Sequence, residues 1–251
     1  MNKKPVLELI NISFSYNASA IVKDVNLSIM RGDFVAMIGP NGGGKTTLLK
    51  LMLGLLSPDT GNVSIFGKNP INVLNRIGYV PQNPFVNNEF PLSALDVVLM
   101  GRLESKIRRF KHSLEDKKLA LNMLLKLDMG EYANRRIGEL SGGQLQRVYI
   151  ARALATNPDI LMLDEPMSNI DSKGRSELNK LLKELNKSIT IILVSHDLMI
   201  LSSSVKSVAC VNQRLHYHKK AEITDEMTNL YQCPVELIAQ GLPMKMNDAQ
   251  V

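Results

Sequence analysis

The chain has little cysteine and no long apolar segment. Its 251 residues include two cysteines, Cys210 and Cys233, which do not form a C-x-x-C pair, so they are predicted to be reduced and structural. No apolar run approaches the roughly eighteen residues of a membrane span, and Glu8 interrupts the N-terminal segment before a signal-peptide core can form. We therefore expect a cytosolic chain that is long enough to bury a large core.

Aromatic residues are also scarce. They make up 5% of the chain and tryptophan is absent, so the stacking surface of a single-strand nucleic-acid binder is missing. The net charge is nevertheless +6. A basic cluster in the middle of the chain is often only a solvated face, but it could also attract nucleic acid, anionic lipid or an acidic partner loop. We rank a lipid-proximal or partner-facing surface first and expect no nucleic-acid partner. The cluster consists of Lys106, Arg108, Arg109, Lys111, Lys117 and Lys118.

A glycine-rich segment at 39–46, G-P-N-G-G-G-K-T, fits the phosphate-loop pattern G-x-x-x-x-G-K-[ST]. The apolar run 34–38 suits a buried strand and 47–53 suits a helix, which is the order that the motif requires. Lys45 would reach the β- and γ-phosphates, and Thr46 would place its hydroxyl on Mg²⁺. The alternative is a glycine-rich turn without a ligand. The predicted ATP-binding residues are Gly39, Pro40, Asn41, Gly42, Gly43, Gly44, Lys45, Thr46 and Thr47.

Two adjacent carboxylates follow a second apolar run. The run 160–163 suits a buried strand, and Asp164, Glu165 and a proline come directly after it. This segment is similar to a Walker B motif, in which Asp164 would hold Mg²⁺ through water and Glu165 would polarise the attacking water. A solvated turn is the alternative, and the phosphate loop upstream argues against it.

Two further polar residues are placed near the same sheet edge. His196 follows the apolar run 189–194, and parallel strands bring such ends together where ligands bind in open α/β folds. His196 could then touch the γ-phosphate or the attacking water, although a lone histidine there is usually a polar cap. Gln82 is either a loop amide or a ligand of Mg²⁺ and water.

A signature-like segment, L-S-G-G-Q-L-Q-R, spans residues 140–147. Ser141 and Gln144 form a capping-box pattern, so the minimal interpretation is a helix start. Gly142 and Gly143, however, would expose the amides of that helix N-terminus and create a second anion site in the chain. Two anion sites and one phosphate loop suggest that the chain works in pairs, with this segment gripping the γ-phosphate held by another subunit.

The segment between Gln82 and the signature is predicted to be mainly helical. Ser113-x-x-Asp116 is a helix start signal, and the leucines that follow are expected to form a buried stripe. The predicted stripe consists of Leu114, Leu121, Leu124 and Leu125.

The order of these motifs resembles the ATP-binding subunit of ABC transporters, over roughly residues 5–215. The resemblance implies a head-to-tail homodimer with two ATP molecules between phosphate loop and signature. It also implies that Tyr16 stacks on adenine, that Asp171 lies in the loop that crosses the dimer, and that a helix of a membrane permease subunit enters a groove beside Gln82.

The resemblance further implies an α/β fold. A P-loop NTPase (RecA-like) core with a mainly parallel sheet and an N-terminal antiparallel β subdomain would occupy about 1–85 and 158–215. An inserted helical subdomain would span about 86–157, and a C-terminal extension 216–251. These parts would form a single domain at the cytoplasmic face of the membrane, bound through the permease.

The transported substrate is indicated only by the sequence similarity of a few segments. The phosphate loop, the signature and the segments 211–218 and 233–238 resemble the zinc and manganese uptake branch, which implies an extracytoplasmic metal-binding protein as an indirect partner. Another transporter (iron complex, heme or export) and a soluble ABC ATPase remain alternatives. His216 and His218 alternate on one strand face, but a plain strand surface is the better interpretation.

Overall fold

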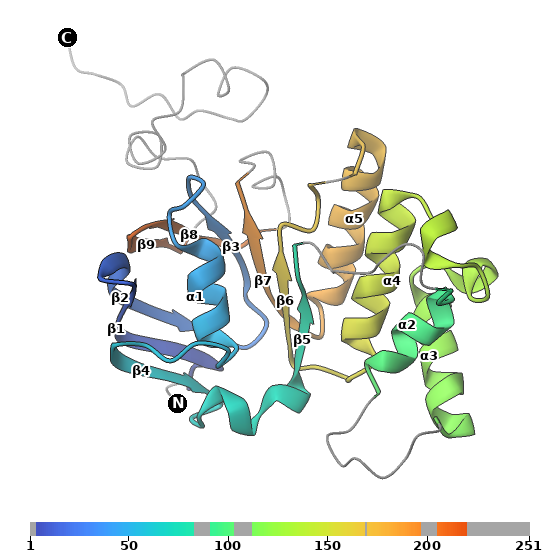
Figure 1. Ribbon diagram of the computed structural model, residues 1–251, viewed down its shortest axis with the longest axis horizontal. Coiled ribbons are helices and arrows are strands. Elements are labelled where there is room, and N and C mark those ends of the chain that lie inside the picture. Colours follow the sequence, from blue (N-terminus) through green and yellow to red (C-terminus); the bar gives the residue numbers. More distant parts are fainter. Residues whose placement is uncertain (1–3, 83–90, 103–111, 169, 197–204, 220–251) are drawn as a thin grey trace.

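The computed structural model describes residues 4–82, 91–102, 112–168, 170–196 and 205–219. They form two β-sheets with helices packed around the larger one (Figure 1). The larger sheet has the order β5-β6-β7-β3-β8-β9, with bounds Ile77–Val80, Ile160–Asp164, Thr190–Ser195, Phe34–Ile38, Ser207–Asn212 and Arg214–His218. The smaller has the order β2-β1-β4, with bounds Ser19–Ile29, Leu7–Tyr16 and Thr60–Ile65. The helices are α1 Lys45–Met52, α2 Ala94–Met100, α3 Leu114–Lys126, α4 Gly142–Leu154 and α5 Ser172–Leu185. Short 3-10 turns lie at Pro70–Asn72, Leu74–Arg76, Gly130–Tyr132 and Ile137–Glu139.

The larger sheet is parallel except for its edge strand β9, which runs antiparallel to β8. Every residue of β3, β6 and β7 is buried, because helices or the second sheet cover both faces. The carboxyl ends of β5, β6, β7 and β3 therefore meet along one sheet edge, and the predicted site residues follow these ends.

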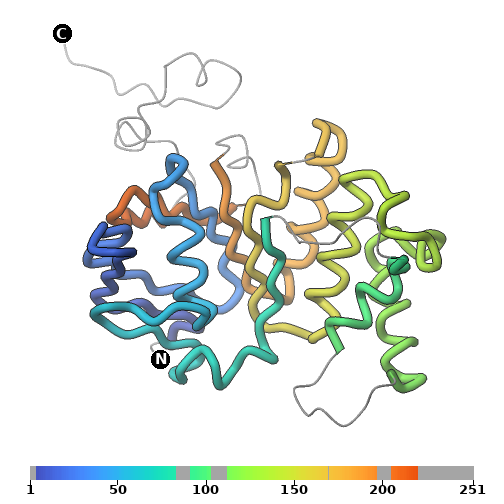
Figure 2. Tube along the Cα trace, viewed as in Figure 1, coloured from blue at the N-terminus to red at the C-terminus, as the bar shows by residue number. Residues whose placement is uncertain are grey.

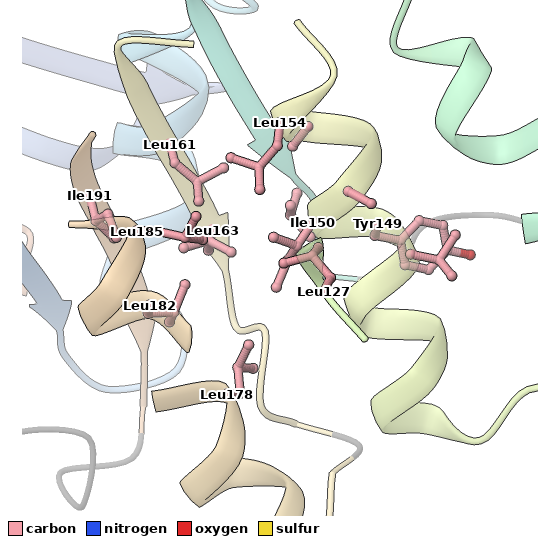
Figure 3. Close-up of a cluster of buried hydrophobic side chains, with 14 of the residues drawn as sticks. Leu127, Tyr149, Ile150, Leu154, Leu161, Leu163, Leu178, Leu182, Leu185 and Ile191 are labelled. Atoms are coloured by element: carbon pink, nitrogen blue, oxygen red, sulfur yellow. The ribbon is translucent and has the colours of Figure 1, made fainter. Parts of the chain in front are cut away.

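The two faces of the larger sheet belong to two apolar cores. Alternate residues such as Val35 and Met37 point toward α1 and the antiparallel sheet, whereas Ala36 and Ile38 point toward the other helices. In the core on the side of α4 and α5, leucines of β6 and α5 pack against apolar residues of α4 (Figure 3). The labelled examples are Leu161, Leu163, Leu178, Leu182, Leu185, Ile150 and Leu154.

The N-terminal strands and the last two strands lie side by side although they are far apart in the sequence (Figure 2). The backbone N–H of Lys23 on β2 donates to the Gln213 carbonyl, 2.7 Å away, at the turn between β8 and β9. Gln213 in turn donates its backbone N–H to the carbonyl of Gly43. The antiparallel sheet is thus tied to the strands that flank the phosphate loop.

The helical region starts each of its α-helices in the same way. Ser93, Ser113 and Ser141 cap α2, α3 and α4, and each forms a capping box with the third helical residue. The predicted start at Ser113 is confirmed, but the predicted buried stripe is correct only at Leu124. Leu124 is fully buried, whereas Leu114, Leu121 and Leu125 are 77%, 39% and 57% exposed. The core-facing side of α3, which contacts α2 and α4, consists of the buried Ala120 and Leu124 with the partly buried Leu119 and Met123.

The predicted α/β fold class is confirmed by the mainly parallel sheet, the antiparallel sheet and the inserted helices. Within the described ranges, no helix is both long and apolar enough to cross a membrane. Cys210 is buried in β8. Cys233 and the basic residues between 106 and 111 lie outside the described residues, while Lys117 and Lys118 are exposed on α3. The subdomain boundaries stay a prediction.

Candidate functional site

The phosphate-loop segment connects β3 to α1, as predicted. Gly44 has φ of 99° and precedes the first helical residue, Lys45, so the chain turns into α1 in a conformation that favours glycine. A Cβ at Gly39 would lie 2.0 Å from the carbonyl oxygen of Val211 on β8, so a side chain does not fit there. The segment is therefore fixed between neighbouring strands while Asn41 and Gly42 at its tip are exposed.

Lys45 is held inside this loop. Its Nζ donates hydrogen bonds to the carbonyl oxygens of Gly39, 2.8 Å away, and Pro40, 3.0 Å away, and the residue is 6% exposed. Burial lowers the pKa of Lys45, and the negative charges of Glu165 and Asp164 act in the opposite direction. The ammonium group thus lies near two carboxylates and is bonded to the loop backbone.

Asp164 lies at the end of β6, facing the start of α1. The hydroxyl of Thr46 donates to Asp164 Oδ1 at 3.4 Å, and Asp164 is 1% exposed. Burial raises the pKa of Asp164, while the Thr46 hydrogen bond lowers it. Tyr79 on β5, which the sequence did not single out, belongs to this surrounding: burial, together with the charge of Asp164, raises the pKa of Tyr79 to about 12.

Glu165 joins the ends of three adjacent strands. Its Oε2 accepts a hydrogen bond from Gln82 Nε2 at 3.2 Å and lies 2.7 Å from His196 Nδ1. The Glu165 side chain is 10% exposed and that of His196 is 53% exposed. Glu165 has φ of 48°, in the left-handed region that a glutamate rarely adopts, which is a form of strain often found at functional sites.

Tyr16 ends β1 at the hairpin that faces the phosphate loop. Its ring packs edge-on against Phe14, with centroids 4.8 Å apart, and the residue is 43% exposed. On the paired strand β2, the Ile21 carbonyl oxygen would lie 2.9 Å from a Cβ at Gly44. The exposed ring is therefore carried by a hairpin that touches the phosphate loop.

The signature residues lie away from the phosphate loop. They belong to α4, which covers the face of the larger sheet opposite to α1. Ser141 caps α4: its Oγ accepts from the Gln144 N–H at 3.3 Å, and Gln144 Oε1 accepts from the Ser141 N–H at 2.9 Å. Asp171 caps α5 by accepting from the Gly174 N–H at 2.9 Å. The starts of both helices line one groove of about 910 Å³, and none of its lining residues in the described ranges belongs to the phosphate loop.

The predicted site residues thus fall into two groups. The phosphate loop, Asp164, Glu165, Gln82 and His196 converge at one sheet edge. The segment 141–144 and Asp171 form the second group. Sequence reasoning gave no role to Arg147 and Glu177, which connect α4 and α5 in the second group; they are 30 residues apart, so neither helix pattern alone could reveal their contact.

The chain is similar to known proteins over most of its length. A family model described as ABC transporter matches residues 22–168. The manganese transport system ATP-binding protein MntB of Bacillus subtilis is 43% identical over 76% of this chain and 77% of its own. The zinc uptake system ATP-binding protein ZurA of Listeria monocytogenes is 38% identical over 87% of each chain. A solved ATP-binding cassette, dimeric and bound to ADP and Pi, superposes with a TM-score of 0.71 at 31% identity, over 87% of this chain and all of that one. The chain therefore belongs to the ABC transporter family, carries its ATP-binding domain and has its α/β P-loop fold.

Proposed function

We propose that the chain is the ATP-hydrolysing subunit of a transporter that takes up a divalent metal ion, zinc or manganese, through partner membrane subunits. The support for the cargo is that relatives covering most of this chain are named for manganese transport and zinc uptake. The support for the motor is geometric, since the residues predicted to act on ATP converge from separate strands.

The observation that carries the proposal is the junction at Glu165. A water molecule placed against the γ-phosphate needs a base within hydrogen-bond reach, and the Glu165 carboxylate is oriented by Gln82 and His196 at 3.2 and 2.7 Å. We assign Glu165 the role of polarising this water. We assign His196, which is more exposed than Glu165, the role of contacting the γ-phosphate while it holds the carboxylate in place.

Binding of the nucleotide is assigned to the loop and helix start that precede this junction. The amides of 42–46 and the N-terminus of α1 would surround the β- and γ-phosphates. Lys45 would exchange its two carbonyl contacts, at 2.8 and 3.0 Å, for phosphate oxygens. Tyr16 would stack on the adenine.

The oxygen atoms of Thr46 and Asp164 fit a magnesium ion, because a hydroxyl and a carboxylate 3.4 Å apart at a buried strand end are the hard ligands that it prefers. We propose that Thr46, Asp164 through water, and Gln82 hold Mg²⁺. When bound, the ion would supply positive charge against the charge that develops on the phosphate oxygens.

The second group of residues is assigned to the nucleotide of another copy of the chain. The exposed Gly142 and the half-buried Gly143, with Ser141 and Asp171, form a helix N-terminus that the chain's own phosphate loop does not share. The dimeric cassette bound to ADP and Pi supports this pairing. ATP would then close a head-to-tail homodimer, and hydrolysis would reopen it at the cytoplasmic face of the membrane, where the permease holds the subunit.

Reconstitution tests the proposal. The chain is assembled in vesicles with permease subunits and an extracytoplasmic metal-binding protein of the proposed transporter. We expect ATP-dependent movement of radioactive zinc or manganese, and its loss with Glu165→Gln. Lys187→Gln, which removes an exposed ion pair with Glu184 just after α5, is the matched control and should transport normally. ATP hydrolysis without movement of either metal would contradict the assigned cargo.

A further inference from the structure

The first turns of α4 and α5 meet around one buried side chain. Ile170, directly before the cap of α5, is 8% exposed. Its Cγ2 atom lies 3.8 Å from the position of a Cβ on Gly143, and a Cβ on Gly174 would lie only 2.4 Å from it. A side chain at Gly174 would therefore push Ile170 out of its place, and the two helix starts are packed against each other through this residue.

One turn further along both helices, an arginine ties them together. Arg147, four residues after Gly143, donates from Nη2 to Glu177 Oε2 on α5 at 2.7 Å. Its Nη1 donates to the Leu127 carbonyl and to Asp128 Oδ2, both at 3.2 Å. These hydrogen bonds connect α4, α5 and the end of α3. The Arg147 side chain is only 19% exposed, so its guanidinium is partly shielded from solvent.

We infer that Arg147 is a positioning residue, and that its contact with Glu177 locks α4 and α5 in one register so that Ser141, Gly143 and Asp171 meet a partner's nucleotide as one rigid surface. The inference rests on the proposed function, because it assumes that this surface faces the nucleotide of a second copy. Both residues lie six positions after their helix caps and line the same groove as the caps; we assign them the role of holding this surface rather than of binding the nucleotide.

The chemistry of arginine suits this task. Its planar fork can donate in two directions at once without rotating, whereas a lysine ammonium is a point charge on a flexible stem. The pair is also far from the phosphate loop, which lies across the larger sheet. Loss of the Arg147–Glu177 contact should therefore weaken the pairing of subunits and leave ATP binding to a single subunit as it was.

The test uses the full chain with Glu165→Gln, which should pair in the presence of ATP without hydrolysing it. Light scattering gives the ATP concentration at which half of the protein is dimeric. Adding Arg147→Gln or Glu177→Gln should raise that concentration about tenfold each, and the two together should raise it no further, because residues in direct contact are not additive. Arg147→Lys should fall between Arg147→Gln and the parent. Binding of a fluorescent ATP analogue to the monomer should be the same in all variants.

Lys187→Gln is the matched control on the same helix region and should not shift the midpoint. An unchanged midpoint in Arg147→Gln, or a double variant about a hundredfold weaker, as two independent residues would give, overturns the positioning role. Glu177, 46% exposed, gives a second route if Arg147→Gln does not fold. If Glu165→Gln itself fails to dimerise with saturating ATP, the proposed function fails and the inference fails with it, which is a different result from an unshifted midpoint.

Discussion

Two helix N-termini are proposed to bind phosphate in this chain, that of α1 behind the phosphate loop and that of α4 in the signature. The start of α1 follows a left-handed glycine, Gly44, and no side chain of the described residues caps it. The start of α4 is closed by the Ser141–Gln144 capping box. The first has a buried lysine aligned beside it, whereas the second is solvent-exposed.

The two helix starts therefore differ in when they can bind a phosphate. An uncapped helix start leaves N–H groups that need an acceptor, so the phosphate of a bound nucleotide would act as the cap of α1. The capping box of α4 already pairs the N–H groups of Ser141 and Gln144, so fewer donors are left there for a phosphate than at the start of α1. We therefore expect the first half to bind ATP in a single subunit, and the second to contribute only after a nucleotide is delivered by another copy.

The largest expected effect comes from the first half. Glu165→Gln should lower the ATP hydrolysis rate by about 10²–10⁴, because a positioned base contributes that much, while ATP binding stays as it was. Single-turnover hydrolysis and equilibrium binding of a labelled nucleotide would measure the two effects separately. A variant that binds ATP far more weakly, or hydrolyses it at the parental rate, would contradict the role of Glu165.

A smaller but still large effect is expected in the second half. Ser141→Arg puts a bulky cation at the start of α4 and should lower hydrolysis by about 10²–10³, the range seen when one donor to a developing charge is removed. ATP binding to the monomer should not change, since the phosphate loop is across the sheet. Titrating protein concentration at saturating ATP is the measurement; a parental rate at high protein concentration would show that the signature is not part of the site.

The sequence predicted the first half better than the second, and the reason is physical. A phosphate loop needs a strand, glycines and a helix in immediate succession, so local order carries the information. The junction at Glu165 could be predicted as well, because parallel strands place their ends at one edge. The contact of Arg147 with Glu177, the wedge of Ile170 and the exposure of Leu114 depend on how α3, α4 and α5 pack, which no periodicity within one helix reveals.

A further prediction concerns the stability of the phosphate loop. Gly44→Ala should lower the free energy of unfolding by roughly 1–2 kcal/mol from the left-handed backbone alone, and by more because the new Cβ would lie 2.9 Å from the Ile21 carbonyl oxygen. Gly32→Ala is the matched control, since Gly32 has φ of 81° and nothing lies within 4 Å of its Cβ position. Urea unfolding of both variants separates strain from crowding; equal losses would mean that the β2 hairpin moves aside without cost.

The smallest expected effect is on the pH dependence of stability, because the pKa values of two carboxyl groups are shifted in opposite directions in the two regions. Burial raises the pKa of Asp164 beside the phosphate loop. In the helical region, the hydrogen bond from Ser113 and then that from Arg102 lower the pKa of Asp116 to about 2. A carboxyl with a lowered pKa stabilises the fold above its unfolded pKa, about 3.9, and this contribution is lost as pH falls through the folded value.

Between about pH 4 and pH 2 the Tm of the parent should therefore fall more steeply than that of Asp116→Asn. Scanning calorimetry across this window would measure it, and Ser113→Ala, which removes the leading hydrogen bond, should flatten the curve in the same direction. Parallel curves for all three proteins would mean that the cap of α3 does not hold the charge of Asp116, and the contrast between the two carboxyls would then reduce to the burial of Asp164.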